Sequence, residues 1–145
     1  MKSPLTGRAC ALDDDAARAS RAAEIAEREG ALIETVTAPW TALPLDAEAF
    51  DLVVIRDVLT QLDLHRRGPV LAEVLRVLRP GGRCIVVEGA GRAGLAALLQ
   101  ARAVNAEYAS SGGAARALSA AGFRATRTLA ERGGLRFVEG VKTAA

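Results

Sequence analysis

Short apolar runs alternate along the chain with longer stretches in which apolar residues recur at helical spacing. The run Leu52–Ile55 is continuous and is bounded by charge at Asp51 and Arg56, a pattern typical of a central strand that is covered on both faces. A second apolar run predicts another strand over Arg83–Glu88. The stretch between them, 69–78, predicts an amphipathic helix. Its apolar stripe consists of Val70, Leu71, Val74, Leu75 and Leu78.

The same alternation predicts the remaining elements. Further strands are expected over 8–12, 32–36, 123–130 and 135–141, and further helices over 16–29 and 93–108, with a short helix that ends at Ala121. Glycine and proline separate these elements, at Gly30 and at Pro80, Gly81 and Gly82. Because only Glu131–Gly134 joins the last two strands, we expect them to form an antiparallel hairpin.

This order predicts an α/β fold. Strands that alternate with helices form a doubly wound, mostly parallel sheet with right-handed crossovers, and the carboxyl-terminal hairpin adds antiparallel strands to it. At 145 residues the chain has the length of one domain, 1–145, which can bury roughly 68–70% of the surface that its unfolded chain exposes. Half of the residues are hydrophobic and a quarter are charged, which argues against disorder.

Composition excludes several classes of function. Nineteen basic residues are interleaved with seventeen acidic ones, and aromatic residues make up only 3%. The chain therefore has neither the basic stripe nor the stacking side chains of a nucleic-acid-binding protein. No apolar stretch approaches the roughly 18 residues of a membrane span, and 1–15 has no signal-peptide core. We expect a cytoplasmic protein with no nucleic-acid or membrane partner.

The sequence indicates no metal site. Cys10 and Cys84 lie on separate predicted strands, and one histidine, His65, does not complete a zinc set with them. The cysteines are interpreted as small buried apolar residues in a reducing compartment. His65 lies in a polar turn without an identifiable partner and is interpreted as an exposed loop residue.

Two longer motifs carry a resemblance. The segments ALPLDAEAFDLVV (42–54) and VLRVLRPGGR (74–83) closely resemble the class I S-adenosylmethionine-dependent methyltransferases, particularly the type 11 group. The resemblance implies a Rossmann-like methyltransferase fold from its second strand to its seventh. It also implies S-adenosylmethionine as cofactor and a small-molecule methyl acceptor, whose identity the sequence does not indicate.

The resemblance assigns roles to three residues of the amino-terminal third. Asp13 corresponds to the acidic residue that accepts hydrogen bonds from the ribose hydroxyls of the cofactor, which suits a carboxylate at a strand end; alternatively, 13–15 cap the following helix. Leu43 would line the adenine pocket, or is ordinary core. The family usually has an acidic residue after the third strand, and in this chain 38–40 replace it. Trp40 in this segment either stacks on adenine or only fills space in the packed interior.

Arg56 and Asp57 complete the set of candidate cofactor-binding residues. They end the central strand and would lie near the methyl donor, although a charged strand terminus explains them equally well. No catalytic residue is identified, because methyl transfer from a sulfonium depends chiefly on positioning the acceptor in line with the methyl group.

The main departure from the family is the absence of a G-x-G-x-G loop, whose glycines allow close backbone approach to the cofactor. The resemblance therefore implies an amino-terminally truncated fold without the first strand, its loop and its helix, and weak or absent cofactor binding. In the family's strand order the missing strand would separate 8–12 from 51–57. We expect these two strands to pair directly, or a second molecule or partner strand to fill the vacancy.

The alternative function is a non-catalytic, methyltransferase-like interaction module.

Overall fold

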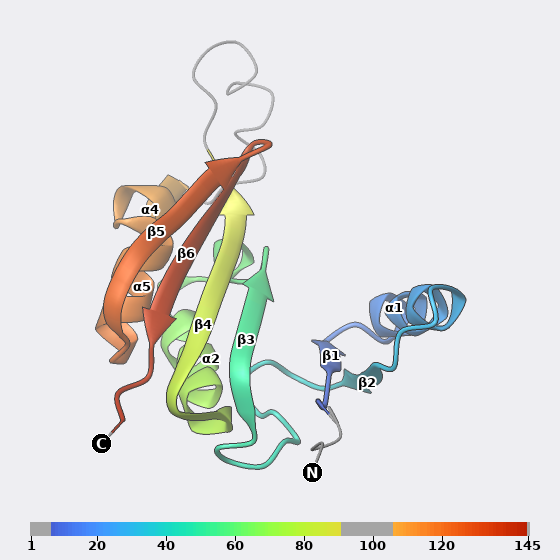
Figure 1. Ribbon diagram of the computed structural model, residues 1–145. Coiled ribbons are helices and arrows are strands. Elements are labelled where there is room, and N and C mark those ends of the chain that lie inside the picture. Colours follow the sequence, from blue (N-terminus) through green and yellow to red (C-terminus); the bar gives the residue numbers. More distant parts are fainter. Residues whose placement is uncertain (1–6, 91–105, 145) are drawn as a thin grey trace. The chain divides into compact units, whose positions relative to one another are not determined.

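The strands form two separate sheets, a two-stranded sheet β1-β2 and a four-stranded sheet of order β3-β4-β6-β5 (Figure 1). The computed structural model describes residues 7–90 and 106–144. The chain divides into two compact units, Met1–Pro44 and Leu45–Ala145, and each unit is described by itself. The expectation of one domain over 1–145 stays a prediction.

The first unit is a parallel strand–helix–strand motif. It consists of β1 (Cys10–Asp13), α1 (Ala16–Arg28) and β2 (Glu34–Thr37), with Cys10 opposite Glu34 and Asp13 opposite Thr37. The Asp15 side chain accepts a hydrogen bond from the backbone N–H of Arg18 at 2.9 Å, which caps the first turn of α1.

The second strand begins two residues later than the expected strand 32–36. Gly30 has a φ of +67° after α1, and the N–H of Ala31 still bonds to the carbonyl oxygen of Ala26 at 2.8 Å. The chain therefore joins β1 only at Glu34, whose N–H bonds to the carbonyl oxygen of Ala9. Leu32, counted as a strand residue from its apolarity, is 97% exposed.

The second unit opens with β3 (Phe50–Arg56), the 3-10 helix η1 (Leu59–Gln61), α2 (Leu64–Val77) and β4 (Leu78–Gly89). β3 and β4 are adjacent and parallel, with Val53 opposite Cys84 and Ile55 opposite Val86, as the sequence predicts. β3 is nevertheless an edge strand of its sheet. Leu52 and Val54 are 45% and 56% exposed, so the expectation of a strand covered on both faces is wrong here.

The helix α2 is longer than the expected 69–78. It begins at Leu64 because the Asp63 side chain accepts a hydrogen bond from the backbone N–H of Arg66 at 3.0 Å and so satisfies a free donor of the first turn. Pro69 lies inside the helix, where it removes one backbone donor. The buried residues of its apolar side hold the helix to the sheet. They are Val70, Leu71, Val74 and Val77.

The carboxyl-terminal part supplies α4 (Ala106–Ser110), α5 (Gly113–Ala121), β5 (Arg124–Arg132) and β6 (Leu135–Val141). β5 and β6 are antiparallel and joined by a glycine turn, and β6 is also antiparallel to β4, which confirms the predicted hairpin. The observed mixed α/β architecture likewise confirms the predicted fold class. Of the expected helix 93–108, the part before 106 lies outside the described residues.

The helices α2, α4 and α5 lie on one side of the four-stranded sheet (Figure 1). Packing there is tight enough to require glycine in β6. A Cβ atom placed on Gly140 would lie 2.9 Å from Cβ of Phe123 and 3.3 Å from Cδ1 of Leu118, closer than side-chain carbons pack. The largest side chains buried in the core are Phe123, Leu59, Leu71, Leu78 and Leu118.

The direct pairing expected between 8–12 and 51–57 does not occur. Among the described residues, β1 pairs with β2 and β3 pairs with β4, in separate sheets. Each of the two strands pairs with the parallel strand that follows it in the chain. In addition, no helix over 7–90 or 106–144 is both long and apolar enough to cross a bilayer.

Candidate functional site

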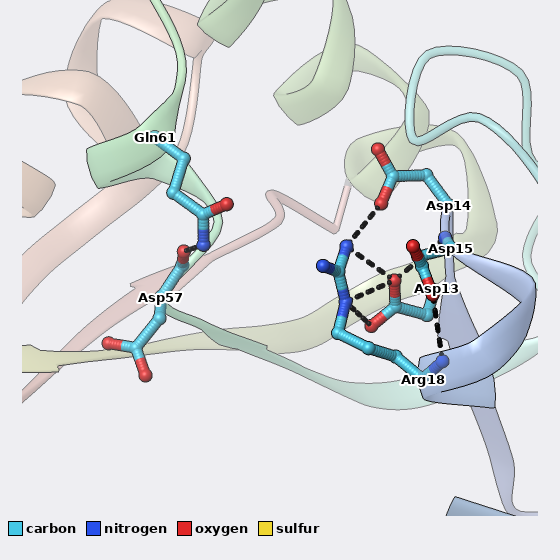
Figure 2. A network of polar contacts seen from close by, with 6 residues as sticks. All are labelled: Asp13, Asp14, Asp15, Arg18, Asp57 and Gln61. Atoms are coloured by element: carbon cyan, nitrogen blue, oxygen red, sulfur yellow. Dashed lines mark hydrogen bonds and ion pairs between the residues drawn. The ribbon is translucent and has the colours of Figure 1, made fainter. Parts of the chain in front are cut away.

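Asp13 ends β1 and is the centre of a polar network (Figure 2). Its Oδ1 accepts a hydrogen bond from the backbone N–H of Asp15 at 2.9 Å. Nε of Arg18 lies 2.9 Å from Oδ1 and 3.1 Å from Oδ2 of Asp13, and Nη2 of Arg18 lies 2.9 Å from Oδ1 of Asp14. Of the three aspartates, Asp15 caps α1, so the helix-capping alternative applies to Asp15 and not to Asp13.

The network keeps Asp13 ionised. Desolvation acts to raise the pKa of this carboxyl group, but the backbone hydrogen bond from Asp15 and the hydrogen bonds and charge of Arg18 outweigh it, so the pKa lies below its ordinary value. The Asp13 side chain is 29% exposed. An ionised carboxylate has about four acceptor positions, and these contacts use most of them. A ribose diol at this site must therefore share Asp13 with Arg18 or displace it.

Trp40 and Leu43 lie in the loop that follows β2, and both are half-buried. The loop starts beside Asp13, because the N–H of Ala38 bonds to the carbonyl oxygen of Asp13 at 3.1 Å. A further bond of 3.1 Å, from the N–H of Ala42 to the carbonyl oxygen of Pro39, closes a turn around Trp40. The first unit thus carries Asp13, Trp40 and Leu43 at and after the carboxyl ends of its two parallel strands.

Arg56 and Asp57 lie at the carboxyl end of β3 in the second unit. Their side chains are 68% and 55% exposed and contact each other at 3.4 Å. Asp57 has a φ of +54°, a left-handed conformation that aspartate tolerates better than most residues. Its N–H bonds to the carbonyl oxygen of Val87 at 3.3 Å, and its carbonyl oxygen accepts a hydrogen bond from the Gln61 side chain (Figure 2). These bonds fix the backbone of Asp57 and leave its carboxylate exposed.

The five candidate residues therefore divide between the units, with three in Met1–Pro44 and two in Leu45–Ala145. Both groups lie where parallel strands end, the usual place for ligands in open α/β sheets. No cluster of histidine, cysteine or acidic residues in the described ranges could hold a metal ion.

The second unit contains a buried polar cluster that the sequence did not predict. Arg67 of α2 has a side chain only 5% exposed. Its Nε bonds to the carbonyl oxygen of Leu59 at 3.2 Å, and its Nη2 bonds to the carbonyl oxygen of Leu62 at 2.7 Å and to Oε2 of Glu107 at 2.9 Å. The guanidinium also lies 4.7 Å from the ring centre of Tyr108, within cation–π range. The sequence around Arg67 is typical of a polar turn, so the burial of the Arg67 side chain was not predicted.

Glu88, near the end of β4, adjoins this cluster. The residue is 5% exposed, and its Oε2 has no hydrogen-bond partner among the described residues. Burial raises the pKa of the Tyr108 phenol above its ordinary value, and the neighbouring Glu88 carboxylate raises it further. Gly113 adjoins the carboxylate: a Cβ atom there would be in van der Waals contact with Oε1 of Glu88, at 3.5 Å.

A pocket of about 370 Å³ opens beside the cluster, between α2, α4 and α5. Arg67 and Tyr108 line it together with Leu64, Leu71 and Arg116. The pocket lies among the helices and not at the strand ends, so it is separate from the candidate cofactor residues Arg56 and Asp57 of the same unit.

The two cysteines are free thiols. Cys84 is fully buried in β4, and burial raises its pKa to about 12, so this thiol is inert at neutral pH. Cys10 is only half-buried, less than the sequence analysis expected.

Comparisons with known proteins point to one family. The family model described as "Methyltransferase domain" matches residues 2–86. Demethylmenaquinone methyltransferase from Clavibacter sepedonicus is 45% identical over 56 residues, which are 39% of this chain and 22% of that enzyme. The chain therefore spans about a fifth of that curated relative.

Solved structures show the same fold. A SAM-dependent methyltransferase from Aquifex aeolicus superposes with a TM-score of 0.74 at 18% identity, over 95% of this chain and 70% of that one. A SAM-dependent methyltransferase from Methanosarcina mazei gives a TM-score of 0.67 at 18% identity, over 94% of this chain and 82% of that one. At these identities the similarity concerns the fold alone.

Proposed function

Because this chain belongs to the methyltransferase domain family, whose model matches more than half of it, we propose that it serves in S-adenosylmethionine-dependent methyl transfer to a small-molecule acceptor. The observation that supports this most directly is the ionised carboxylate of Asp13 at the end of a parallel strand. A carboxylate there can accept hydrogen bonds from two adjacent hydroxyl groups.

The residues fit the nucleoside part of S-adenosylmethionine. Asp13 would accept the ribose hydroxyls, and Trp40 and Leu43, which follow the neighbouring strand, would contact the adenine. In the second unit, Arg56 and Asp57 lie where β3 ends, the position at which family resemblance would place the methyl donor. When bound, the cofactor supplies an activated methyl group. The residues of this chain bind and orient it, and positioning is the main requirement of such a transfer.

The fit is incomplete at the aminocarboxyl end. The 145 residues contain no G-x-G-x-G loop that would bring backbone N–H groups close to this part of the cofactor. One charged hydrogen bond contributes about 1.5–3 kcal/mol, whereas micromolar affinity requires about 8 kcal/mol. Arg18 also competes for the Asp13 carboxylate. We therefore expect this chain alone to bind the cofactor weakly and to have little activity by itself.

A second candidate function is a non-catalytic interaction module. The observation that favours it is the edge strand β3, which exposes Leu52 and Val54. Exposed apolar edges are typical sites of strand addition.

We also place the protein in the cytoplasm. Both of its cysteines are free thiols. Free thiols are typical of a reducing compartment.

Fluorescence of Trp40, the single tryptophan, tests the first function. S-adenosylmethionine is titrated to millimolar concentration into the wild-type chain, Asp13→Asn and the matched control Asp14→Asn. We expect a weak, saturable change in wild type and in the control, and its loss in Asp13→Asn. No change in wild type, or equal behaviour of the two variants, would contradict the assigned role of Asp13 and favour the interaction module.

A further inference from the structure

The side chain of Arg67 contacts two different elements with the two edges of its guanidinium group. On one edge, Nε bonds to the carbonyl oxygen of Leu59 and Nη2 to that of Leu62, the residues that begin and follow η1. On the other edge, Nη2 and Nη1 lie 2.9 Å and 3.4 Å from the two carboxylate oxygens of Glu107 in α4. The planar fork of arginine suits both sets of acceptors at once, whereas an ammonium group lacks this geometry.

The short helix η1 gains support from these bonds. Its own backbone bonds run from the N–H of Gln61 to the carbonyl oxygen of Val58 at 3.0 Å, and from the N–H of Leu62 to that of Leu59 at 3.3 Å. Val58, which precedes the turn, has an apolar side chain that cannot cap it. A cationic side chain that donates to the carbonyl groups at the end of a helical turn stabilises that turn. Arg67 is in that position for η1.

In turn, η1 holds the end of β3. The Gln61 side chain donates a hydrogen bond to the carbonyl oxygen of Asp57 (Figure 2), and the N–H of Asp57 bonds to the carbonyl oxygen of Val87 in β4 at 3.3 Å. Asp57 has a φ of +54°. A residue other than glycine keeps such a conformation only where its surroundings impose it, and such residues gather at functional sites. A series of bonds therefore links Arg67, through η1, to Asp57.

We propose that Arg67 is a positioning residue for the strand-end site of the second unit. Its guanidinium group fixes η1, and η1 fixes the backbone of Asp57 in the conformation from which this residue presents its carboxylate. The inference rests on the proposed function in one respect only, because the ligand expected at that strand end is the methyl-donor part of S-adenosylmethionine. Arg67 acts through Gln61 and makes no contact with the ligand itself.

Amide hydrogen exchange of the full chain, followed by NMR, tests the link without any ligand. Arg67→Met keeps an apolar side chain and removes the donors, and Arg66→Met is the matched control, because Arg66 is the neighbouring residue of α2 and is exposed. We expect exchange at Leu62 and Asp57 to become about tenfold faster or more in Arg67→Met, and to stay within about twofold of wild type in Arg66→Met. Unchanged exchange at Asp57 in Arg67→Met overturns the proposal.

The double variant Gln61→Ala/Arg67→Met distinguishes positioning from a general effect on stability. Gln61→Ala alone removes the bond to the carbonyl oxygen of Asp57 and should speed exchange at Asp57 but not at Leu62. If Arg67 acts through Gln61, the double variant exchanges at Asp57 no faster than Gln61→Ala, because residues in one network of contacts do not act additively. Additive effects at Asp57 overturn the proposal. If Arg67→Met does not fold by circular dichroism, Arg67→Lys replaces it with the same expected direction, since lysine lacks the fork.

Titration of the same variants with S-adenosylmethionine separates this inference from the proposed function. We expect the dissociation constant to rise about threefold or more in Arg67→Met and to stay within about twofold of wild type in Arg66→Met. A wild type that does not bind overturns the proposed function, and the exchange rates at Asp57 then decide the role of Arg67 by themselves. Equal affinity of wild type and Arg67→Met, with faster exchange at Asp57, overturns the assignment of Arg67 to the cofactor site.

Discussion

Nε of Arg18 lies 2.9 Å and 3.1 Å from the two carboxylate oxygens of Asp13. The carboxylate to which family resemblance assigns the ribose is thus already bound by the first turn of the helix that follows it. This contact both orients the carboxylate and competes with a ligand for it. It is the reason to treat Asp13 as an ionised but partly occupied acceptor.

The first prediction concerns the ionisation of Asp13. Arg18→Ala removes the guanidinium, so the pKa of Asp13, now lowered, should rise toward its ordinary value. A carboxyl group with a lowered pKa in the folded state stabilises the protein above its unfolded pKa, about 3.9, and this contribution is lost as the pH falls through the folded value. Because the pair is exposed, the effect on stability should be small.

Carbon-detected NMR titration of the Asp13 carboxyl group measures this shift. Arg28→Ala, at the other end of α1, is the control, since Arg28 contacts Glu29 and not Asp13. An Asp13 pKa that is the same in wild type and Arg18→Ala would show that the ion pair does not form in solution.

The second prediction concerns the apolar side of α2. Val74 is 4% exposed, so Val74→Asp buries an unpaired charge and should lower the free energy of unfolding by about 3 kcal/mol or more. Ala72→Asp is the matched control, because Ala72 is exposed on the same helix. Thermal unfolding distinguishes them. Equal melting temperatures for the two variants would contradict the placement of this helix against the sheet.

The third prediction concerns Gly140. Gly140→Ala introduces a Cβ atom 2.9 Å from Cβ of Phe123, and overpacking of this kind destabilises by about 1–3 kcal/mol. Gly89→Ala in β4 meets no atom within 4 Å and should stabilise by about 0.5–1 kcal/mol, because glycine loses more conformational freedom on folding than alanine. Chemical denaturation should give opposite signs for the two variants. The same sign for both would count against the close approach of β6 to Phe123.

The fourth prediction concerns Tyr108, the single tyrosine. Its pKa is raised in the folded state, first by burial and then by Glu88. A phenol with a raised folded pKa contributes stability that is fully present below its unfolded pKa, about 10. That contribution is lost as the pH rises through the folded value. Tyr108→Phe should therefore flatten the fall in stability above about pH 10.

Alkaline titration by ultraviolet absorbance reports the same phenol directly. In Glu88→Gln the pKa of Tyr108 should fall, because the neighbouring charge is removed, while burial keeps it above the ordinary value. Glu107→Gln is the control on the Arg67 side of the cluster. Normal titration of Tyr108 in wild type would contradict the buried position of the ring.

The sequence predicted most of the helices and strands of the fold. The apolar runs of β3 and β4, the helical spacing of Val70, Leu71 and Val74, and the short connector before Leu135 all led to the right elements, because period and turn chemistry act locally. The residues at which these elements begin and end were predicted less well. α2 starts at Leu64 through the Asp63 cap, although Pro69 suggested a later start.

Sequence patterns did not predict the tertiary features of the structure. The burial of Arg67 and Glu88 depends on helices that are distant in the chain, as the bond of Arg67 to Glu107 shows, and no periodicity indicates it. The position of β3 at a sheet edge depends on which strands pair. For the candidate site, Asp13, Arg56 and Asp57 do lie at strand ends as expected, but the contact of Arg18 with Asp13 was not foreseen.

Calorimetric titration of the 145-residue chain with S-adenosylmethionine tests most directly the claim that this methyltransferase-family chain holds the cofactor only by its nucleoside end. The account predicts weak binding, with a dissociation constant above about 10 μM, equivalent to less than about 7 kcal/mol. A dissociation constant below about 10 μM would contradict this account, because the chain would then bind the aminocarboxyl end of the cofactor as well.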